Sequence, residues 1–320
     1  MLILVLTWIN SKGLKTGAWL GTGILLLVFA GLFTIIFFGL TSHESNLGMA
    51  FKMETTDNKA ITFSAMFTAM LQAFWAYQGW ASVGFIGGEA KNANKNIPRG
   101  IAIGVIIIIC MYLLVNIAYL SLLPIESLEQ VTASGNKIAA IEAVKIFWGR
   151  NGELFIAILI LITTLGCNHA TVITSCRVYY AMAKEGLFFK KAGELNKYAV
   201  PGNSLLFQCV WACLLVLSGT FDQLTDMIIF VMFLFYGATA LGVFILRKKM
   251  PDAPRPYKVW GYPVVPAIVI LIAAGLFINT IATKPREAGF GLILMLTGVP
   301  MWYWFNRKKR SLESGVRSQN

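Results

Sequence analysis

Long apolar runs alternate with short polar segments along the whole chain. Crossing about 30 Å of hydrocarbon takes about 20 helical residues. Runs of sufficient length lie near residues 17–40, 64–88, 100–122, 154–181, 203–220, 224–246, 262–282 and 288–306. The pattern therefore predicts an all-α integral membrane protein with about eight transmembrane helices.

The first nine residues, MLILVLTWI, are apolar but too few to cross a bilayer. As a helix they reach only about 14 Å, which is half a membrane. Lys12 and Lys15 follow directly, as in a loop on the cytoplasmic side. We therefore expect residues 1–9 to be a partial helix and the protein to be N-terminally truncated. One transmembrane domain is expected over 1–310, with a cytoplasmic tail over 311–320.

Composition agrees with a protein that lies mostly in lipid. Hydrophobic residues make up 57% of the chain and charged residues 13%, with a mean hydropathy of +0.68. Soluble domains carry about 25% charged residues. All five cysteines fall within the expected spans and none has zinc-ligand spacing with a histidine, so we expect packing roles and neither a metal site nor a cofactor.

The net charge of +12 follows from the placement of the basic residues. The segments 10–16, 89–99, 177–202, 247–261 and 307–320 alternate with the others along the chain and hold 20 of the 27 lysines and arginines. By the positive-inside rule these segments are cytoplasmic. We therefore predict a multi-pass protein of the cell (inner) membrane with a cytoplasmic C-terminus. The charge then reports topology, and we expect membrane lipid and no nucleic acid as a partner.

The second run is unusual for a membrane anchor. Its sequence QAFWAYQGWASVGFIGGEA carries Gly79 and Gly84 among Trp75, Tyr77 and Trp80. Glycine loosens a helix, and freed backbone groups are tolerated at this depth only where they line a cavity or site. Packing of the aromatic rings against neighbouring helices is the alternative. A broken helix exposes carbonyl groups on one side and N–H groups on the other, which suits a zwitterionic substrate.

Two other runs carry polar or aromatic residues at their centres. Asn168 and His169 lie in a polar stripe of the fourth run, where a lone histidine is more often a structural hydrogen-bonding group than a ligand. Phe233 and Tyr236 lie in the middle of the sixth run, where core packing is the alternative to a pocket role. All four side chains are candidates for the wall of a substrate site.

Motifs for covalent chemistry are absent from the sequence, which lacks HExxH, a Walker loop and a GxSxG motif near a histidine. The cores of the spans hold no charged residue except Arg177, near a cytoplasmic end. Intramembrane charges mark ion and proton pathways. The sequence therefore favours exchange or facilitated movement of a substrate over proton pumping, and it does not favour an enzyme.

Four segments together resemble a known family. FWAYQGW followed by GFIGGEAKNANKNIPRGI closely resembles the sixth helix and adjoining loop of the amino acid–polyamine–organocation superfamily. Within it, the L-type amino acid transporter group and bacterial amino acid exchangers are most similar. The supporting segments, in the family's order, are VNIAYLSLLP, SCRVYYAMAKEGLF and LRKKMPDAPRPYKVWGYPVVP.

The resemblance implies a LeuT-like inverted-repeat transporter fold, of which this chain holds the equivalents of helices 5–12. In that fold the first and sixth helices are broken and bind the substrate. The family's first helix, with its carboxylate-binding break, has no counterpart here. Alternating access would move the substrate without covalent chemistry.

The resemblance also assigns roles to residues. Trp75 occupies the position of the aromatic gate over the substrate. Ala76, Tyr77, Gln78 and Gly79 form the unwound linker, and Gln78 departs from a position that is often glycine in relatives. Further pocket positions correspond to Asn168 and to Phe233 or Tyr236. Glu89 is expected to fix the helix exit or a cytoplasmic gate by pairing with a basic residue.

The sequence thus predicts an amino acid permease that works as an exchanger, or antiporter, of an L-amino acid. The alternative is a membrane relic or ligand sensor, derived from such a permease, that does not transport. Ligand-dependent stabilisation without flux would favour the sensor, whereas counterflow of a labelled amino acid would favour the carrier.

Overall fold

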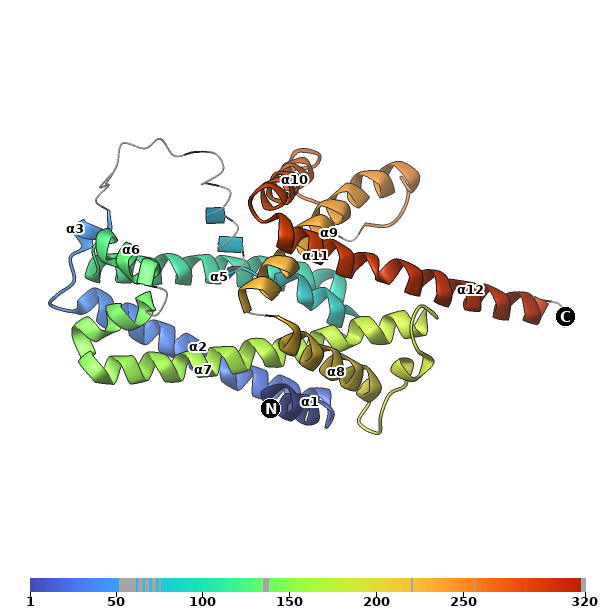
Figure 1. Cartoon of the computed structure of the whole chain (residues 1–320), viewed down its shortest axis with the longest axis horizontal. Coiled ribbons are helices and arrows are strands. Elements are labelled where there is room, and N and C mark those ends of the chain that lie inside the picture. The colour runs from blue at the N-terminus through green and yellow to red at the C-terminus, as the bar shows by residue number, and fades with distance from the viewer. Residues whose placement is uncertain are drawn as a thin grey trace. The chain divides into compact units, whose positions relative to one another are not determined.

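A computed structural model describes residues 1–51, 62, 66, 69–70, 73–74, 76–134, 138–219, 221–255 and 257–317 (Figure 1). Regular structure within these residues is helical throughout. The α-helices are α1 (Leu2–Asn10), α2 (Leu14–Thr41), α3 (Leu47–Ala50), α5 (Ala93–Leu122), α6 (Ile125–Ser134), α7 (Ala139–Lys184), α8 (Gly202–Ser218), α9 (Phe221–Lys249), α10 (Val264–Thr283), α11 (Pro285–Leu296) and α12 (Gly298–Arg317). The 3₁₀-helices are η1 (Trp80–Glu89) and η2 (Lys190–Gly193).

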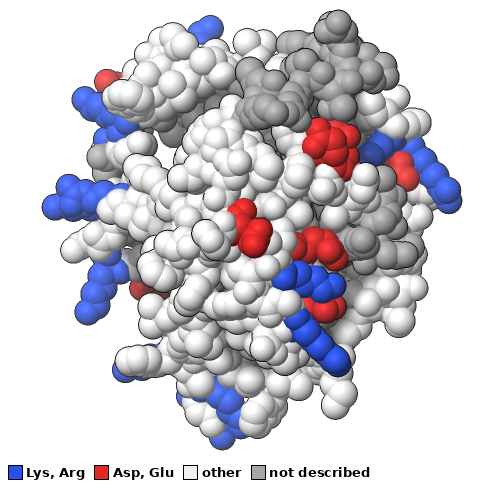
Figure 2. Space-filling view, turned by 90° about the vertical axis from the view of Figure 1, so that its left-hand side faces the viewer, with Lys and Arg blue, Asp and Glu red and all other residues white. Residues whose placement is uncertain are grey.

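Within the part of the chain that the structure describes, six helical stretches are long and apolar enough to cross a membrane. They are Lys15–Thr41, Ala93–Leu122, Ala139–Lys184, Gln223–Lys249, Val264–Thr283 and Pro285–Arg307. This confirms the all-α membrane class. Figure 2 shows one face of the protein, on which most of the described surface is uncharged.

Two of the eight expected spans differ from this set. The run 203–220 forms α8, which is apolar but has only 17 residues. Seven of the 25 residues of the run 64–88 lie outside the described residues, and its last part forms the 3₁₀-helix η1. The expected extents of the domain and tail remain predictions.

The chain forms two compact units. The first consists of residues 1–58, 100–174 and 196–200, and the second of residues 59–99, 175–195 and 201–320. The helices α5 and α7 each contribute residues to both units.

In the first unit, α2 packs along α5 and α7. Ile35 packs with Ile156 and Leu159 of α7, while Ile36 on the next position packs with Met111 and Val115 of α5. Burial of such branched side chains at native density holds the helices in register. Adjacent faces of α2 thus contact two different neighbours, α5 and α7.

A buried polar network joins α1, α2 and α7 at one end of the same unit. His169 Nε2 lies 2.7 Å from the carbonyl oxygen of Gly17, which can only accept, so this nitrogen carries the proton. His169 Nδ1 then accepts from Asn10 Nδ2 at 3.3 Å, and Asn10 also donates to the Leu6 carbonyl at 2.9 Å. His169 is therefore a structural hydrogen-bonding residue, in line with the simpler of the two expectations for it.

In the second unit, α9 packs against α10 and α11. Ile229 and Phe233 of α9 are buried with Ala273 and Leu276 of α10. Where α11 meets α9, Gly291 allows close approach, because a Cβ there would lie 3.3 Å from the Met227 carbonyl oxygen. This packing fixes one face of α9 and leaves a neighbouring face for the candidate site.

Candidate functional site

The chain turns at Tyr77–Gly79, where the sequence predicts a break in a membrane helix. Ala76 is still helical, whereas residues 77–79 form a turn. Gly79 has φ +120° and ψ −21°, a backbone conformation that L side chains rarely adopt. The 3₁₀-helix η1 starts immediately afterwards. Glycine is required at position 79 by this backbone geometry.

A small cavity lies between the turn and α9. It has a volume of about 40 Å³. Its lining comprises Phe74, Tyr77, Gln78, Trp80, Ile229, Met232, Phe233 and Tyr236. Ligand sites for small molecules usually measure about 300–1,000 Å³. The cavity therefore cannot enclose a free amino acid by itself, but it can take a small side chain or ordered water.

Aromatic contacts hold the turn against α9. The Phe74 and Phe233 rings meet edge to face with centroids 5.2 Å apart, and the Trp80 and Tyr236 rings lie 5.7 Å apart. Such pairs contribute about 0.5–1.5 kcal/mol beyond their burial. Phe74 precedes the turn Tyr77–Gly79 and Trp80 follows it, so the chain on both sides of the break is anchored to α9.

Between the described residues, a polar contact crosses the cavity. The Tyr236 hydroxyl donates to Gln78 Oε1 at 3.3 Å. This is longer than the usual 2.5–3.0 Å of an O–H···O bond. A weak bond of this kind leaves both groups available to a polar ligand.

The structure brings together four of the site residues that the sequence predicts. Tyr77, Gln78, Phe233 and Tyr236 line the cavity, and Phe233 is also buried against α10. Gly79 adjoins the lining through the backbone turn. Ala76 is exposed, and Trp75 lies outside the described residues.

Asn168 belongs to the other compact unit. Its Nδ2 donates to the Thr164 carbonyl of its own helix at 2.9 Å, and the side chain is half-buried. A donor bonded to the i−4 carbonyl is only partly available to a substrate. The role of Asn168 stays a prediction.

Sequence reasoning missed part of the α9 wall. Ile229 and Met232 line the cavity together with Phe233 and Tyr236. These positions are i, i+3, i+4 and i+7, the spacing of one helix face. That spacing was the available signal, but in a helix that is apolar on all sides it does not distinguish a pocket face from a packing face.

Glu89 forms an ion pair at the end of η1. Arg177 Nε donates to Glu89 Oε1 at 2.8 Å and Arg177 Nη2 to Oε2 at 3.2 Å, a bidentate arrangement. The Arg177 side chain is 8% exposed and that of Glu89 41%. The expected pairing of Glu89 with a basic residue is thus present, and its role in a gate stays a prediction.

Comparison with known proteins defines the class. The model of the amino acid permease family matches residues 1–304, so the chain belongs to this family of the amino acid–polyamine–organocation superfamily. It is therefore an all-α membrane protein of a multi-pass transporter family. Among its relatives is the serine/threonine exchanger SteT of Bacillus subtilis (strain 168), which is 29% identical over 314 residues, or 97% of this chain and 69% of SteT.

Mammalian relatives match as well. Large neutral amino acids transporter small subunit 2 of Mus musculus is 32% identical over 250 residues, which cover 75% of this chain and 45% of the relative. The b(0,+)-type amino acid transporter 1 of Mus musculus is 26% identical over 314 residues, covering 95% of this chain and 61% of the relative. The chain thus spans about half the length of these mammalian proteins.

Proposed function

We propose that this protein exchanges L-amino acids across the cell membrane by alternating access. The observation that carries the proposal is the turn at Tyr77–Gly79, with its adjoining aromatic and polar cavity on α9. At membrane depth, an interrupted backbone is tolerated only where it is buried in protein or lines a cavity, which a bundle of plain anchoring helices does not require. Family membership and the names of the relatives support the substrate class.

The break would bind the parts that all amino acids share. Carbonyl groups freed before Gly79 attract the ammonium group, and N–H groups freed at the start of η1 attract the carboxylate. Gln78 and Tyr236 would then face the variable side chain, since their weak mutual bond can be exchanged for bonds to a ligand. Trp75 would close over the substrate.

The Glu89–Arg177 pair would act at the cytoplasmic end of the path. It joins the end of η1 to the end of α7, two segments that carry basic neighbours on the predicted cytoplasmic side. Opening a path between them requires separation of a bidentate ion pair. Because the span cores carry no carboxylate, exchange rather than proton coupling is the proposed mode.

The substrate-site assignment is tested by Trp75→Ala in the purified full chain. A panel of amino acids is first screened for an increase in melting temperature, and exchange of the stabilising amino acid is then measured in proteoliposomes. We expect Trp75→Ala to express normally and to lose exchange. Normal exchange by the variant would remove the gate assignment. Stabilisation without flux in the unaltered protein would favour the ligand sensor instead.

A further inference from the structure

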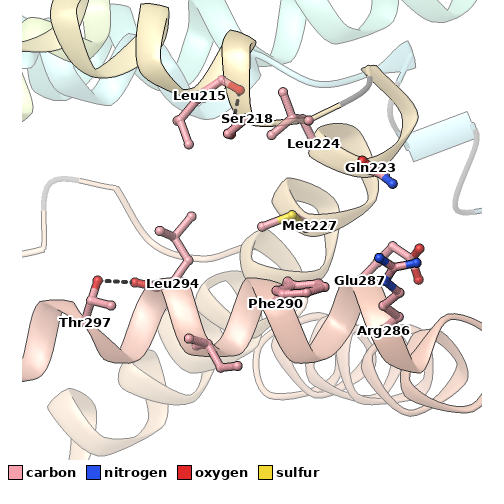
Figure 3. A pocket seen from close by; sticks show the side chains of 12 residues that line it. Leu215, Ser218, Gln223, Leu224, Met227, Arg286, Glu287, Phe290, Leu294 and Thr297 are labelled. Atoms are coloured by element: carbon pink, nitrogen blue, oxygen red, sulfur yellow. Dashed lines mark hydrogen bonds between the residues drawn. The ribbon is translucent and has the colours of Figure 1, made fainter.

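A larger cavity in the second unit is lined by residues outside the proposed substrate site. It measures about 390 Å³ and lies between α11 and the joined ends of α8 and α9 (Figure 3). This volume falls within the range of small-molecule sites. The lining residues are Leu215, Ser218, Gly219, Gln223, Leu224, Met227, Arg286, Glu287, Phe290, Ile293, Leu294 and Thr297.

From its place along the apolar stretch Pro285–Arg307, we expect the cavity to run from a membrane interface towards the middle of the bilayer. The spanning stretch Pro285–Arg307 begins beside Arg286, whereas Thr297 lies near its centre. Along α11 these two residues are separated by about 16 Å, roughly half of a hydrocarbon core of about 30 Å. Figure 3 shows Arg286 at one end of the lining and Thr297 towards the other. The length of the cavity thus corresponds to one leaflet.

The part of the cavity away from Arg286 is apolar, and several of its lining side chains are exposed. Phe290 and Ile293 are 52% and 62% exposed, and Leu294 and Met227 complete the wall. The two hydroxyls nearby are satisfied locally, since Ser218 donates to the Leu215 carbonyl and Thr297 to the Leu294 carbonyl. This part therefore suits a hydrocarbon chain, and the hydrogens of its two hydroxyls are already used.

The mouth, in contrast, carries two opposite charges. Arg286 and Glu287 are adjacent in the first turn of α11 and both line the cavity. Arg286 lies over the Phe290 ring, with Cζ 5.9 Å from its centroid. Among the ion pairs of the described residues, none involves Arg286 or Glu287. A cation and an anion at the interface are thus available to one ligand.

We propose that this cavity binds one phospholipid with a primary ammonium headgroup, phosphatidylethanolamine. The Arg286 guanidinium matches a phosphate in geometry and charge. The Glu287 carboxylate accepts N–H bonds from the lipid ammonium group, which has three donors. One acyl chain lies along Phe290 and Leu294 towards Thr297. A choline headgroup has no N–H to donate, and a glycerol headgroup has no cation for Glu287.

Defined lipids test the site without any transport assay, so the outcome is independent of the proposed exchange. The purified full chain is delipidated in detergent and mixed with phosphatidylethanolamine, phosphatidylcholine or phosphatidylglycerol that carry identical acyl chains. Native mass spectrometry counts bound lipids, and the melting temperature reports stabilisation. We expect phosphatidylethanolamine to bind about tenfold more tightly than the other two.

Two charge variants separate the headgroup contacts. Glu287→Gln should bind phosphatidylethanolamine and phosphatidylcholine equally, while Arg286→Gln should weaken binding of all three phospholipids. Lys248→Gln, exposed at the opposite end of α9, is the matched control and should leave the order unchanged. Leu294→Trp should reduce binding of every lipid by filling the apolar wall.

Equal binding of the three lipids by the unaltered protein would overturn the proposal. A preference for phosphatidylethanolamine over phosphatidylcholine that survives in Glu287→Gln would also overturn it. If Leu294→Trp fails to fold, the two charge variants still decide, because Arg286 is exposed and its replacement leaves the helix packing intact.

Discussion

At the scale of single residues, the least expected contact is the bond between Gln78 and Tyr236. The two residues are 158 positions apart, and the Tyr236 hydroxyl reaches Gln78 Oε1 at 3.3 Å. The sequence identified the two separately, Gln78 through the family resemblance and Tyr236 as an aromatic residue in the middle of an apolar run. Their pairing depends on how the turn at Tyr77–Gly79 packs against α9, which a hydropathy pattern does not report.

This pair should affect substrate affinity more than stability. We expect Gln78→Leu and Tyr236→Phe each to lower apparent affinity by about three- to tenfold, the range of one net hydrogen bond. The melting temperature should change little, because Gln78 is exposed and the bond is long. A double-mutant cycle in proteoliposome exchange measures the coupling. Tyr303→Phe, an exposed tyrosine of α12, is the control; additive effects of the two changes would contradict a shared role.

The Glu89–Arg177 pair should contribute to stability as well. Glu89→Gln leaves the Arg177 guanidinium, 8% exposed, without its charged partner. Breaking a buried pair costs about 3–5 kcal/mol, and the 41% exposure of Glu89 reduces the expected loss to about 1–3 kcal/mol. Thermal unfolding in detergent measures the loss. Glu185→Gln, exposed in the turn after α7, should unfold like the unaltered protein.

At the scale of helices, the α2–α7 contact depends on glycine. A Cβ on Gly17 would lie 2.7 Å from Asn10 Oδ1 and 2.9 Å from Ile173 Cδ1. Gly17→Ala should therefore disturb the Asn10–His169 network and destabilise the protein by about 1–3 kcal/mol. Gly23, six residues further along the same helix, has no neighbour within 4 Å of such a Cβ. Gly23→Ala should be neutral or slightly stabilising in the same melting experiment; equal losses for both would contradict the packing account.

The helices could be predicted from hydropathy better than the segments between them. The runs near 17–40, 224–246 and 262–282 correspond closely to α2, α9 and α10. The basic segment 89–99 was expected as a loop, but α5 already begins at Ala93 and includes Pro98. Asn96 stabilises this start by donating to the Lys91 carbonyl at 2.7 Å. Polar composition alone does not show that local hydrogen bonds extend a helix beyond the lipid.

The candidate site could be located but not assembled from sequence. Glycines and aromatics identified residues 75–79 because such residues are unusual at membrane depth. Ile229 and Met232 could not be separated from packing residues, and the partner of Glu89 lies 88 positions away in Arg177. Contacts of this range follow from tertiary structure, which the one-dimensional pattern does not encode.

At the scale of the whole molecule, composition, charge placement and helix pattern agree on a multi-pass membrane protein of the amino acid permease family. The interrupted segment at Tyr77–Gly79 is the feature on which the proposed carrier function rests. We therefore expect this chain to move an amino acid through the membrane, rather than only to bind one.

Counterflow distinguishes transport from binding alone. The purified protein is reconstituted into vesicles loaded with a high concentration of an unlabelled amino acid, and entry of the same labelled amino acid is followed. If the protein is an exchanger, label accumulates rapidly inside the vesicles. This accumulation depends on the internal amino acid and does not occur in protein-free vesicles. Entry at the protein-free rate for every amino acid that stabilises the protein would contradict the account and identify a membrane-bound amino acid sensor.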